Sequence, residues 1–159
     1  MNLRRIEPED TAALIELRGR TRENAISEEA LRRMGITAAG VARMLGSTHR
    51  GWLVEDQGRV AGFAIGDGSS GELWVIAVAP EFEGRGIGSR LLAQVESWLR
   101  TCGWETLWLW TDVDERRRAF AFYLRHGLSK VEVKDGRLFM QKKLPGSAQR
   151  STAAGESRS

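Results

Sequence analysis

Three glycines at alternate positions mark the segment of this chain whose chemistry is easiest to infer. Residues 83–89 read Glu-Gly-Arg-Gly-Ile-Gly-Ser, between a predicted strand and a predicted helix. Glycine removes side chains from a tight loop, so successive amides can turn toward one concavity. The first amides of a helix also lack partners within the helix and carry partial positive charge. The segment therefore predicts an anion site suited to phosphate.

Two other phosphate-binding loops fit this spacing poorly. The dinucleotide-binding fingerprint would need a glycine at the position of Ser89, and it usually follows the first strand of its domain. The phosphate loop of nucleotide hydrolases needs a lysine and then Ser or Thr after its last glycine, whereas here Arg90 follows Ser89. A glycine-rich helix entry without any ligand is the remaining alternative, and it would cost backbone entropy for no purpose.

Strand and helix patterns alternate on both sides of this loop. We expect strands over residues 2–6, 52–55, 59–65, 72–78, 106–111, 131–133 and 138–141, and helices over 9–20, 27–34, 38–45, 86–102 and 116–126. Consecutive strands early and strand–helix–strand units later predict an α/β (mixed α+β) fold. Its central mixed sheet would have six or seven strands, with helices on both faces. Cys102 falls on the apolar side of the long helix, so we expect it to pack in the core.

Composition narrows the class of protein. The chain has 159 residues, of which 42% are apolar and 28% charged, as in one globular domain. We expect that domain over residues 1–144 and a disordered tail over 145–159, which is small and polar. With a single cysteine, no internal disulfide can form, and we expect no metal site. Without an apolar signal core or an 18-residue apolar run, we expect a cytoplasmic protein with no membrane partner.

The net charge of +3 is a weak excess, and the arginines are interleaved with acids. A nucleic-acid-binding protein is therefore a weak alternative, and we expect no nucleic-acid partner. The sequence does not decide the oligomeric state and leaves a homodimer open.

Two motifs in combination resemble the GCN5-related N-acetyltransferase (GNAT) family. Residues 83–88 resemble the family's Gln/Arg-x-x-Gly-x-Gly/Ala motif. Residues 116–128, from Arg116 through Ala119 and Tyr123 to Gly127 and Leu128, resemble its Asn-x-x-Ala-x-x-x-Tyr-x-x-x-Gly-Phe signature. The resemblance extends over about residues 2 to 144. It implies a GNAT-like acyl-CoA N-acyltransferase fold, whose fourth and fifth strands splay apart around acetyl-CoA.

The resemblance also implies where the acetyl-CoA cosubstrate binds. Backbone groups of Ile76, Ala77 and Val78 would pair with its pantetheine arm as an added strand does. The Val78 amide would polarise the thioester carbonyl. The pyrophosphate would lie on the loop amides, which belong to Gly84, Arg85, Gly86, Ile87, Gly88 and Ser89.

Two positions depart from the family pattern. Glu83 replaces the usual Gln or Arg beside a phosphate site, so it must point to solvent or pair with an arginine such as Arg85. Arg116 replaces the usual Asn at the start of a helix, where the dipole disfavours cations. A CoA phosphate near Arg116 or its arginine neighbours would offset that cost, and a solvated face is the alternative.

Transfer to an amine needs groups that move protons. Tyr123 is the only tyrosine, and it falls where family members commonly have the acid that protonates the leaving thiolate. A phenol with a pKa of about 10 is reasonably matched to a thiolate with a pKa of about 8.5. Glu72 is the first candidate for the base, Asp112 is the second, and bulk water is the third.

The predicted activity is N-acetyl transfer to a primary amine of a small molecule or peptide, by direct attack in a ternary complex. The alternative is a catalytically silent module that binds CoA or a metabolite on the same fold.

Overall fold

The computed structural model describes residues 1–144 and divides the chain into two compact units, Met1–Val95 and Glu96–Ser159. The tail expected over 145–159 lies outside the described residues. Seven strands and five α-helices alternate along the described chain, which confirms the mixed α/β fold class. No helix among residues 1–144 is long and apolar enough to cross a membrane.

The first unit is built on antiparallel strands that follow one another in sequence. They are β1 (Asn2–Arg5), β2 (His49–Asp56), β3 (Arg59–Asp67) and β4 (Glu72–Val78), and each pairs with the next. Gln57 and Gly58 join β2 to β3 with φ values of 52° and 77°. Two successive positive φ angles match the twist of a tight hairpin, which fixes the β2–β3 register.

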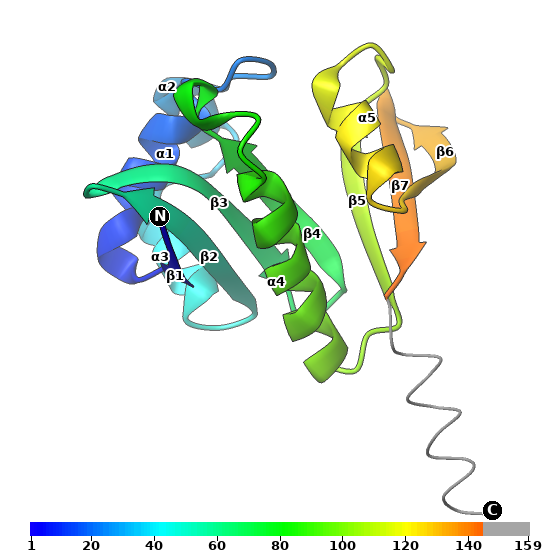
Figure 1. Ribbon diagram of the computed structural model, residues 1–159, viewed down its shortest axis with the longest axis horizontal. Helices are drawn as coiled ribbons and strands as arrows, with labels where there is room; N and C mark the ends of the chain where they lie inside the picture. Colours follow the sequence, from blue (N-terminus) through cyan, green and yellow to red (C-terminus); the bar gives the residue numbers. More distant parts are fainter. Residues whose placement is uncertain (145–159) are drawn as a thin grey trace, which may run out of the picture. The chain divides into compact units, whose positions relative to one another are not determined.

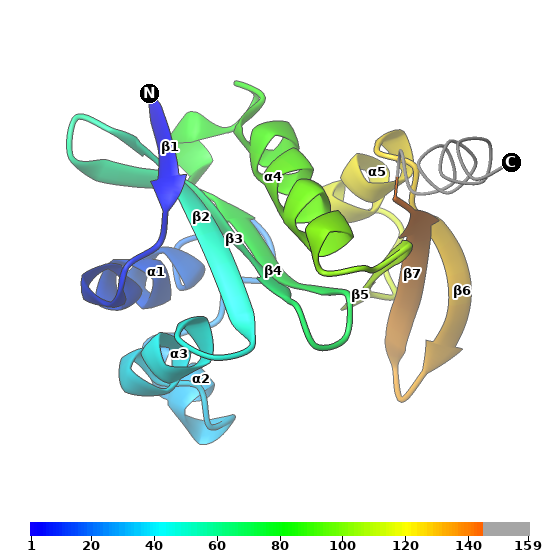
Figure 2. The same cartoon turned by 90° about the horizontal axis from the view of Figure 1, so that it is seen from below.

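Helices cover both faces of this sheet. They are α1 (Thr11–Arg18), α2 (Glu28–Arg33), α3 (Ala38–Leu45) and α4 (Ile87–Thr101). In Figure 2, α1 and α3 lie on one face of β2 and β3, and the first turns of α4 lie on the other. The hydroxyl groups of Ser27 and Thr37 cap α2 and α3, each accepting from a backbone amide at 3.1 Å. Both caps supply an acceptor for an amide that the helix itself leaves unpaired.

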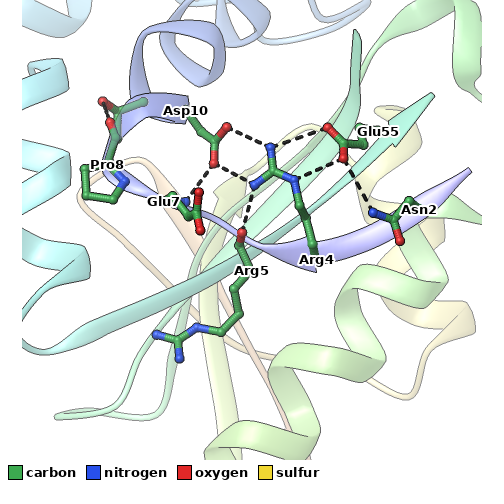
Figure 3. Close-up of polar contacts among 8 residues, drawn as sticks. Asn2, Arg4, Arg5, Glu7, Pro8, Asp10 and Glu55 are labelled. Atoms are coloured by element: carbon green, nitrogen blue, oxygen red, sulfur yellow. Dashed lines mark hydrogen bonds and ion pairs between the residues drawn. The ribbon is translucent and has the colours of Figure 1, made fainter. Parts of the chain in front are cut away.

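One arginine fastens the N-terminal strand to its surroundings (Figure 3). The Arg4 guanidinium donates two 2.9 Å hydrogen bonds to the Asp10 carboxylate and a 3.1 Å bond to Glu55 on β2. Asp10, just before α1, also accepts from the Glu7 amide at 2.7 Å. The hydrogen bonds from Arg4 lower the pKa of Asp10. A forked, charge-assisted contact of this kind holds β1 against both β2 and α1.

The second unit begins within α4 and has its own antiparallel strands and one complete helix. These are β5 (Thr106–Asp112), α5 (Arg118–Arg125), β6 (Ser129–Lys134) and β7 (Arg137–Lys143), and β7 pairs with both β5 and β6. Along β5, Leu107 and Leu109 are buried, while Trp108 and Trp110 share the other face with Phe139 of β7. The two tryptophans therefore lie on one side of the strand, as strand alternation requires.

The prediction for Cys102 was wrong, because its side chain is exposed. The fully buried stripe of α4 runs through Ile87, Leu91 and Val95 to Leu99 and not to Cys102. The helix ends at Thr101, and Gly103 (φ 96°) turns the chain away immediately afterwards. Because the helix ends before Cys102, its side chain no longer continues the apolar stripe that the helical periodicity predicts.

Helix starts also differ from the expectation. Helix α1 begins at Thr11 because Pro8–Asp10 forms a separate 3-10 turn, η1, before it. Helix α5 begins at Arg118, and not at residue 116, because the Asp114 carboxylate accepts from the Arg116 amide at 3.0 Å and holds that stretch in a turn. Side chains that bond to nearby amides compete with helix formation in this way.

Candidate active site

The glycine-rich loop adopts the conformation that its composition predicts. After β4 the chain makes a short 3-10 turn, η2 (Pro80–Phe82), and enters α4 at Ile87. Gly84 and Gly86 have φ values of 78° and 77°, in the left-handed region that other residues rarely adopt. A Cβ at either position would meet no atom within 4 Å, so the need for glycine is conformational and not steric.

The amides of this loop are available to a ligand. The first hydrogen bond of α4 joins the Arg90 amide to the Gly86 carbonyl at 3.1 Å. Across the described part of the chain, no backbone carbonyl accepts from the amides of residues 84–88. Gly84, Arg85 and Gly86 are exposed, and the first amides of a helix have no partner within it, so these amides can reach an anionic ligand.

Close packing holds both ends of the loop in place. Gly62 on β3 lies opposite Val78, where β4 ends. A Cβ on Gly62 would come within 2.9 Å of the Ala77 carbonyl oxygen and 3.0 Å of Ile87 Cγ2. The missing side chain therefore lets the start of α4 lie directly against β3 and β4. The loop between these contacts has little freedom to shift as a whole.

Ion pairs connect the loop to a segment far away in the sequence. Glu83 pairs with Arg22 at 2.7 Å, in the stretch between α1 and α2. Glu81 pairs with Arg20 at 3.4 Å and makes a short contact with Arg59 of β3. Glu83 thus pairs with an arginine, as one of the two sequence-based alternatives proposed, but its partner is Arg22 and not Arg85. Nothing in the sequence identifies this partner, because the two residues are 61 positions apart.

Arg85 lies back along the turn that precedes the loop. Its guanidinium is 5.1 Å from the centroid of the Phe82 ring, and Nη2 donates to the Glu81 carbonyl at 3.4 Å. The Phe82 side chain is buried, so its ring is a fixed surface for the Arg85 guanidinium. Arg85 therefore places a positive charge beside the amides without using its charge on a carboxylate, a suitable arrangement for an anionic ligand.

Backbone groups of strand β4 alternate between the side that faces β3 and the opposite side. The Ala79 amide donates to the Ala61 carbonyl at 2.8 Å. In an antiparallel ladder, hydrogen-bonded positions alternate, so Ala77 is paired with Phe63 in the same way. The amides and carbonyls of Ile76 and Val78 therefore point away from β3. The prediction that this strand pairs with a pantetheine arm rests on these two residues and not on Ala77.

A β-bulge interrupts β4 at Trp74, two residues before Ile76. Ile65 pairs with Val75 and Gly66 pairs with Leu73, so Trp74 is an extra residue on β4. Bulges bend a strand and increase its twist, and they often lie beside functional sites. The sequence pattern showed an uninterrupted strand here, because the bulge depends on the register with β3.

The candidate base lies at the start of β4 beside a histidine–carboxylate pair. Glu72 is opposite Asp67 of β3, and His49 Nε2 is 3.9 Å from Asp67 Oδ2. The Trp74 ring meets the His49 ring edge-on, 5.5 Å between centroids. Burial of the His49 ring lowers its pKa. Sequence reasoning assigned nothing to His49, and the structure places it opposite Asp67, the β3 residue that also lies opposite Glu72.

The candidate acid and the arginine motif belong to the second unit. Tyr123 on α5 is 8% exposed, and its ring is edge-on to Phe122. Arg116 makes a two-pronged ion pair with Asp114 at 2.9 and 3.1 Å, and its side chain is 91% exposed. The Arg116 hydrogen bonds lower the pKa of Asp114 to about 2. This arrangement favours the solvated-face interpretation of Arg116 over a phosphate contact.

Two neighbouring residues complete the description of this stretch. The Asp112 carboxylate, the second candidate for the base, accepts from the Asp114 amide at 2.7 Å. The Nε atom of Arg117 is buried and has no hydrogen-bond partner among residues 1–144.

Nowhere among residues 1–144 do three or more His, Cys, Asp or Glu residues gather as they would around a metal ion.

The loop geometry, the bulged strand and the mixed sheet together define an acyl-CoA-type transferase fold. The model of the acetyltransferase (GNAT) family matches residues 12–128, which is most of the chain. The chain therefore belongs to the GNAT acetyltransferase family, and the resemblance seen in its motifs is confirmed.

Solved structures and curated proteins agree with this assignment. The PaiA N-acetyltransferase of Thermoplasma acidophilum, solved in complex with coenzyme A, has a TM-score of 0.77 at 20% identity over 90% of this chain and 99% of that one. The ribosomal-protein-S18-alanine N-acetyltransferase of Escherichia coli has a TM-score of 0.69 at 22% identity over 90% and 93%. At these identities the similarity shows the fold alone.

Two curated relatives match at higher identity over shorter stretches. A mycothiol acetyltransferase of Beutenbergia cavernae is 34% identical over 87 residues, which are 52% of this chain and 29% of the relative. An uncharacterised N-acetyltransferase of Methanocaldococcus jannaschii is 37% identical over 73 residues, 46% of this chain and 32% of the relative. The matches thus span about a third of the length of these curated relatives.

Proposed function

We propose that this chain transfers the acetyl group of acetyl-CoA to a primary amine of a small molecule or peptide, in a ternary complex. The observation that carries the proposal is the run of amides at residues 84–88, which no backbone carbonyl of the described chain occupies. Membership of the GNAT family supports acetyl transfer. The coenzyme A bound to the Thermoplasma acidophilum neighbour supports an acyl-CoA donor.

Backbone groups of two segments bind the acyl donor. The amides of Gly84 to Ser89 hold the diphosphate, and the backbone of Ile76 and Val78 orients the pantetheine arm. Bound acetyl-CoA supplies an acetyl group activated as a thioester.

Three further groups act on the reacting atoms. Glu72 accepts a proton from the acceptor ammonium, directly or through water, and so frees the nitrogen lone pair. The Val78 amide donates to the carbonyl oxygen as negative charge develops on it. As the carbon–nitrogen bond forms and the carbon–sulfur bond breaks, Tyr123 gives its proton to the departing sulfur, and the nitrogen loses its second proton through water, which returns a proton to the Tyr123 oxygen.

A catalytically silent CoA-binding module is the second candidate. It is favoured by the two departures from the family pattern: the loop begins with the carboxylate of Glu83, and Arg116 is exposed and paired with Asp114. Both functions predict CoA binding, and only the first predicts product.

One experiment tests both candidates. The chain is incubated with acetyl-CoA and a panel of amines: amino acids, polyamines, aminoglycosides, peptides with free N-termini and lysine peptides. Thiol release is followed by absorbance, and acetylated product is identified by mass. Titration calorimetry with CoA is run in parallel. If CoA binding releases heat but no amine of the panel is acetylated, the acetyltransferase proposal fails and the silent CoA-binding module is supported. If CoA gives no heat, both proposals are refuted.

A further inference from the structure

The helices of the second unit contact one face of its sheet. In Figure 1, α5 lies across β5 and β7. Lys142 Nζ on β7 donates to the His126 carbonyl at the end of α5 at 2.7 Å, and it pairs with Glu96 of α4 at 2.8 Å. Successive side chains of a strand point to opposite faces, so these contacts place both helices on the face of Lys142. The other face carries no helical contact of this kind within residues 96–144.

This other face, which we call the acceptor face, combines two aromatic rings with four charged side chains. Directly opposite residues of an antiparallel pair share a face. Two neighbouring rows across β5, β7 and β6 make up the acceptor face: Trp110, Phe139 and Glu132 in one row, and Asp112, Arg137 and Lys134 in the next. The Trp110 and Phe139 rings are half-buried and lie against each other with 39° between their planes. Apolar contact area therefore lies next to charges of both signs.

Arg137 is a guanidinium without a carboxylate partner. Its side chain is exposed, lies 4.4 Å from the centroid of the Trp110 ring, and makes no ion pair or hydrogen bond within residues 1–144. Lys134 is directly opposite it on β6, and two like charges in such positions repel each other. A guanidinium presents a planar fork of donors that matches a carboxylate. The charges around Arg137 therefore favour a ligand with a carboxylate.

Asp112 is directly opposite Arg137 on β5, yet the two side chains form no ion pair. Asp112 Oδ1 accepts instead from the Asp114 amide at 2.7 Å, in the turn that follows the strand. A carboxylate and a guanidinium thus lie in one row without neutralising each other. An ammonium group complements the first as a carboxylate complements the second. An α-amino acid carries both groups, together with its side chain, on a single carbon.

We propose that the acceptor face binds the amine acceptor, and that the acceptor is an α-amino acid with a large apolar side chain. Arg137 holds the carboxylate, Asp112 binds the ammonium form, and the rings of Trp110 and Phe139 contact the side chain. Asp112 is given no part in the proton transfer. The inference rests on the proposed function, because it names the class of amine that receives the acetyl group.

Four probes that differ by single groups test the assignment: phenylalanine, phenylalaninamide, phenethylamine and alanine. The amide removes the charge of the carboxylate, phenethylamine removes the whole group, and alanine removes the ring. Acetylation is measured at saturating acetyl-CoA. The wild type should acetylate phenylalanine with a kcat/KM at least about tenfold above that of each other probe, the effect of one charge-assisted contact or one buried ring.

Arg137→Ala should lower kcat/KM about tenfold for phenylalanine and much less for phenylalaninamide. The ratio of the two changes cancels the different basicities of the two amines. Arg137→Lys keeps the charge without the fork and should recover only part of the loss. Trp110→Leu, which keeps an apolar side chain in the sheet, should reduce the preference for phenylalanine over alanine.

Controls separate recognition of the acceptor from folding. Arg125→Ala removes another exposed arginine of the second unit, on α5 and outside the acceptor face, and should leave the rates with all four probes unchanged. Calorimetry with CoA on every variant should give the wild-type affinity, because none of these substitutions touches the loop proposed for the donor.

The outcomes distinguish the two proposals. If the wild type acetylates phenylalaninamide as efficiently as phenylalanine, or if Arg137→Ala slows both equally, the acceptor face is overturned while acetyl transfer stands. If no amine is acetylated, the proposed transfer fails, and calorimetry of phenylalanine with the CoA complex decides the acceptor face alone. Heat that Arg137→Ala abolishes would support the face, and no heat with the wild type would overturn it.

Discussion

Tyr123 is the residue on which the proposed proton transfer to sulfur depends. Tyr123→Phe keeps the ring that packs edge-on against Phe122 and removes only the phenol oxygen. We expect turnover to fall by at least about tenfold, because a positioned acid contributes at least that much to such a step. The calorimetric affinity for CoA should be nearly unchanged. Steady-state kinetics with saturating amine measure the effect, and a wild-type turnover number in the variant would remove Tyr123 from the mechanism.

His49 offers a test of the electrostatics of its pair with Asp67. Burial lowers the pKa of His49 below the 6.5 of an exposed ring, against the opposing effect of Asp67. The unfolded chain therefore takes up a proton at His49 that the folded chain resists. The contribution of the neutral His49 to the free energy of unfolding is therefore complete above pH 6.5. It is lost as the pH falls from 6.5 through the pKa of His49 in the folded chain.

Urea unfolding from pH 7.5 down to about 5 measures this dependence. His49→Gln, which does not titrate, should lose less stability across that range than the wild type does. An equal loss in both proteins, or an NMR titration that puts the His49 pKa above 6.5, would contradict the prediction.

At the scale of elements, the loop before α4 and the β6–β7 turn provide a matched pair of glycines. Gly86 (φ 77°) and Gly136 (φ 73°) share a left-handed conformation, and a Cβ would meet nothing within 4 Å at either. Replacement by alanine should therefore cost about 1 kcal/mol of stability in both variants. Only Gly86→Ala should also weaken CoA binding, by about tenfold or more, because it disturbs amides that hold the diphosphate.

The two measurements on these variants are denaturant unfolding and CoA calorimetry. Equal affinities in Gly86→Ala and Gly136→Ala would mean that the loop conformation is a folding requirement alone, and the cradle would lose its main support.

Elements with local signals were predictable from the sequence. Helices α2 and α3, capped by Ser27 and Thr37, begin within one residue of the predicted starts, and both ends of β4 were predicted correctly. Each of these features is decided within a few residues, by a hydroxyl acceptor, a turn or an apolar run. The positive φ angles of Gly84 and Gly86 are also decided locally, because glycine adopts them without steric cost.

Features that depend on distant partners were not predictable. The bulge at Trp74 exists only in register with β3, and the Glu83–Arg22 pair joins positions 61 residues apart. The exposure of Cys102 depends on where α4 ends against its surroundings, although its periodicity suggested burial. The conformation of the loop before α4 was therefore predictable, whereas the ion pairs beside it were not.

At the scale of the whole molecule, ligand binding should register as global stability. A ligand that binds only the folded chain adds RT ln(1 + [L]/Kd), about 2.7 kcal/mol at a hundred times Kd. For a chain of 159 residues this corresponds to a rise in Tm of about 5–10 °C. Saturating CoA should produce that shift in the wild type and in Tyr123→Phe.

Gly86→Ala should need correspondingly more CoA to reach the same Tm, because its Kd is larger. Hydrogen exchange identifies where the added stability is anchored: amides that the loop leaves uncommitted in the free chain should exchange more slowly once the diphosphate accepts from them. Slower exchange over residues 84–88 with CoA would link the global shift to the cradle. A shift in Tm without protection there would place the binding energy elsewhere in the molecule and contradict the site proposed for the donor.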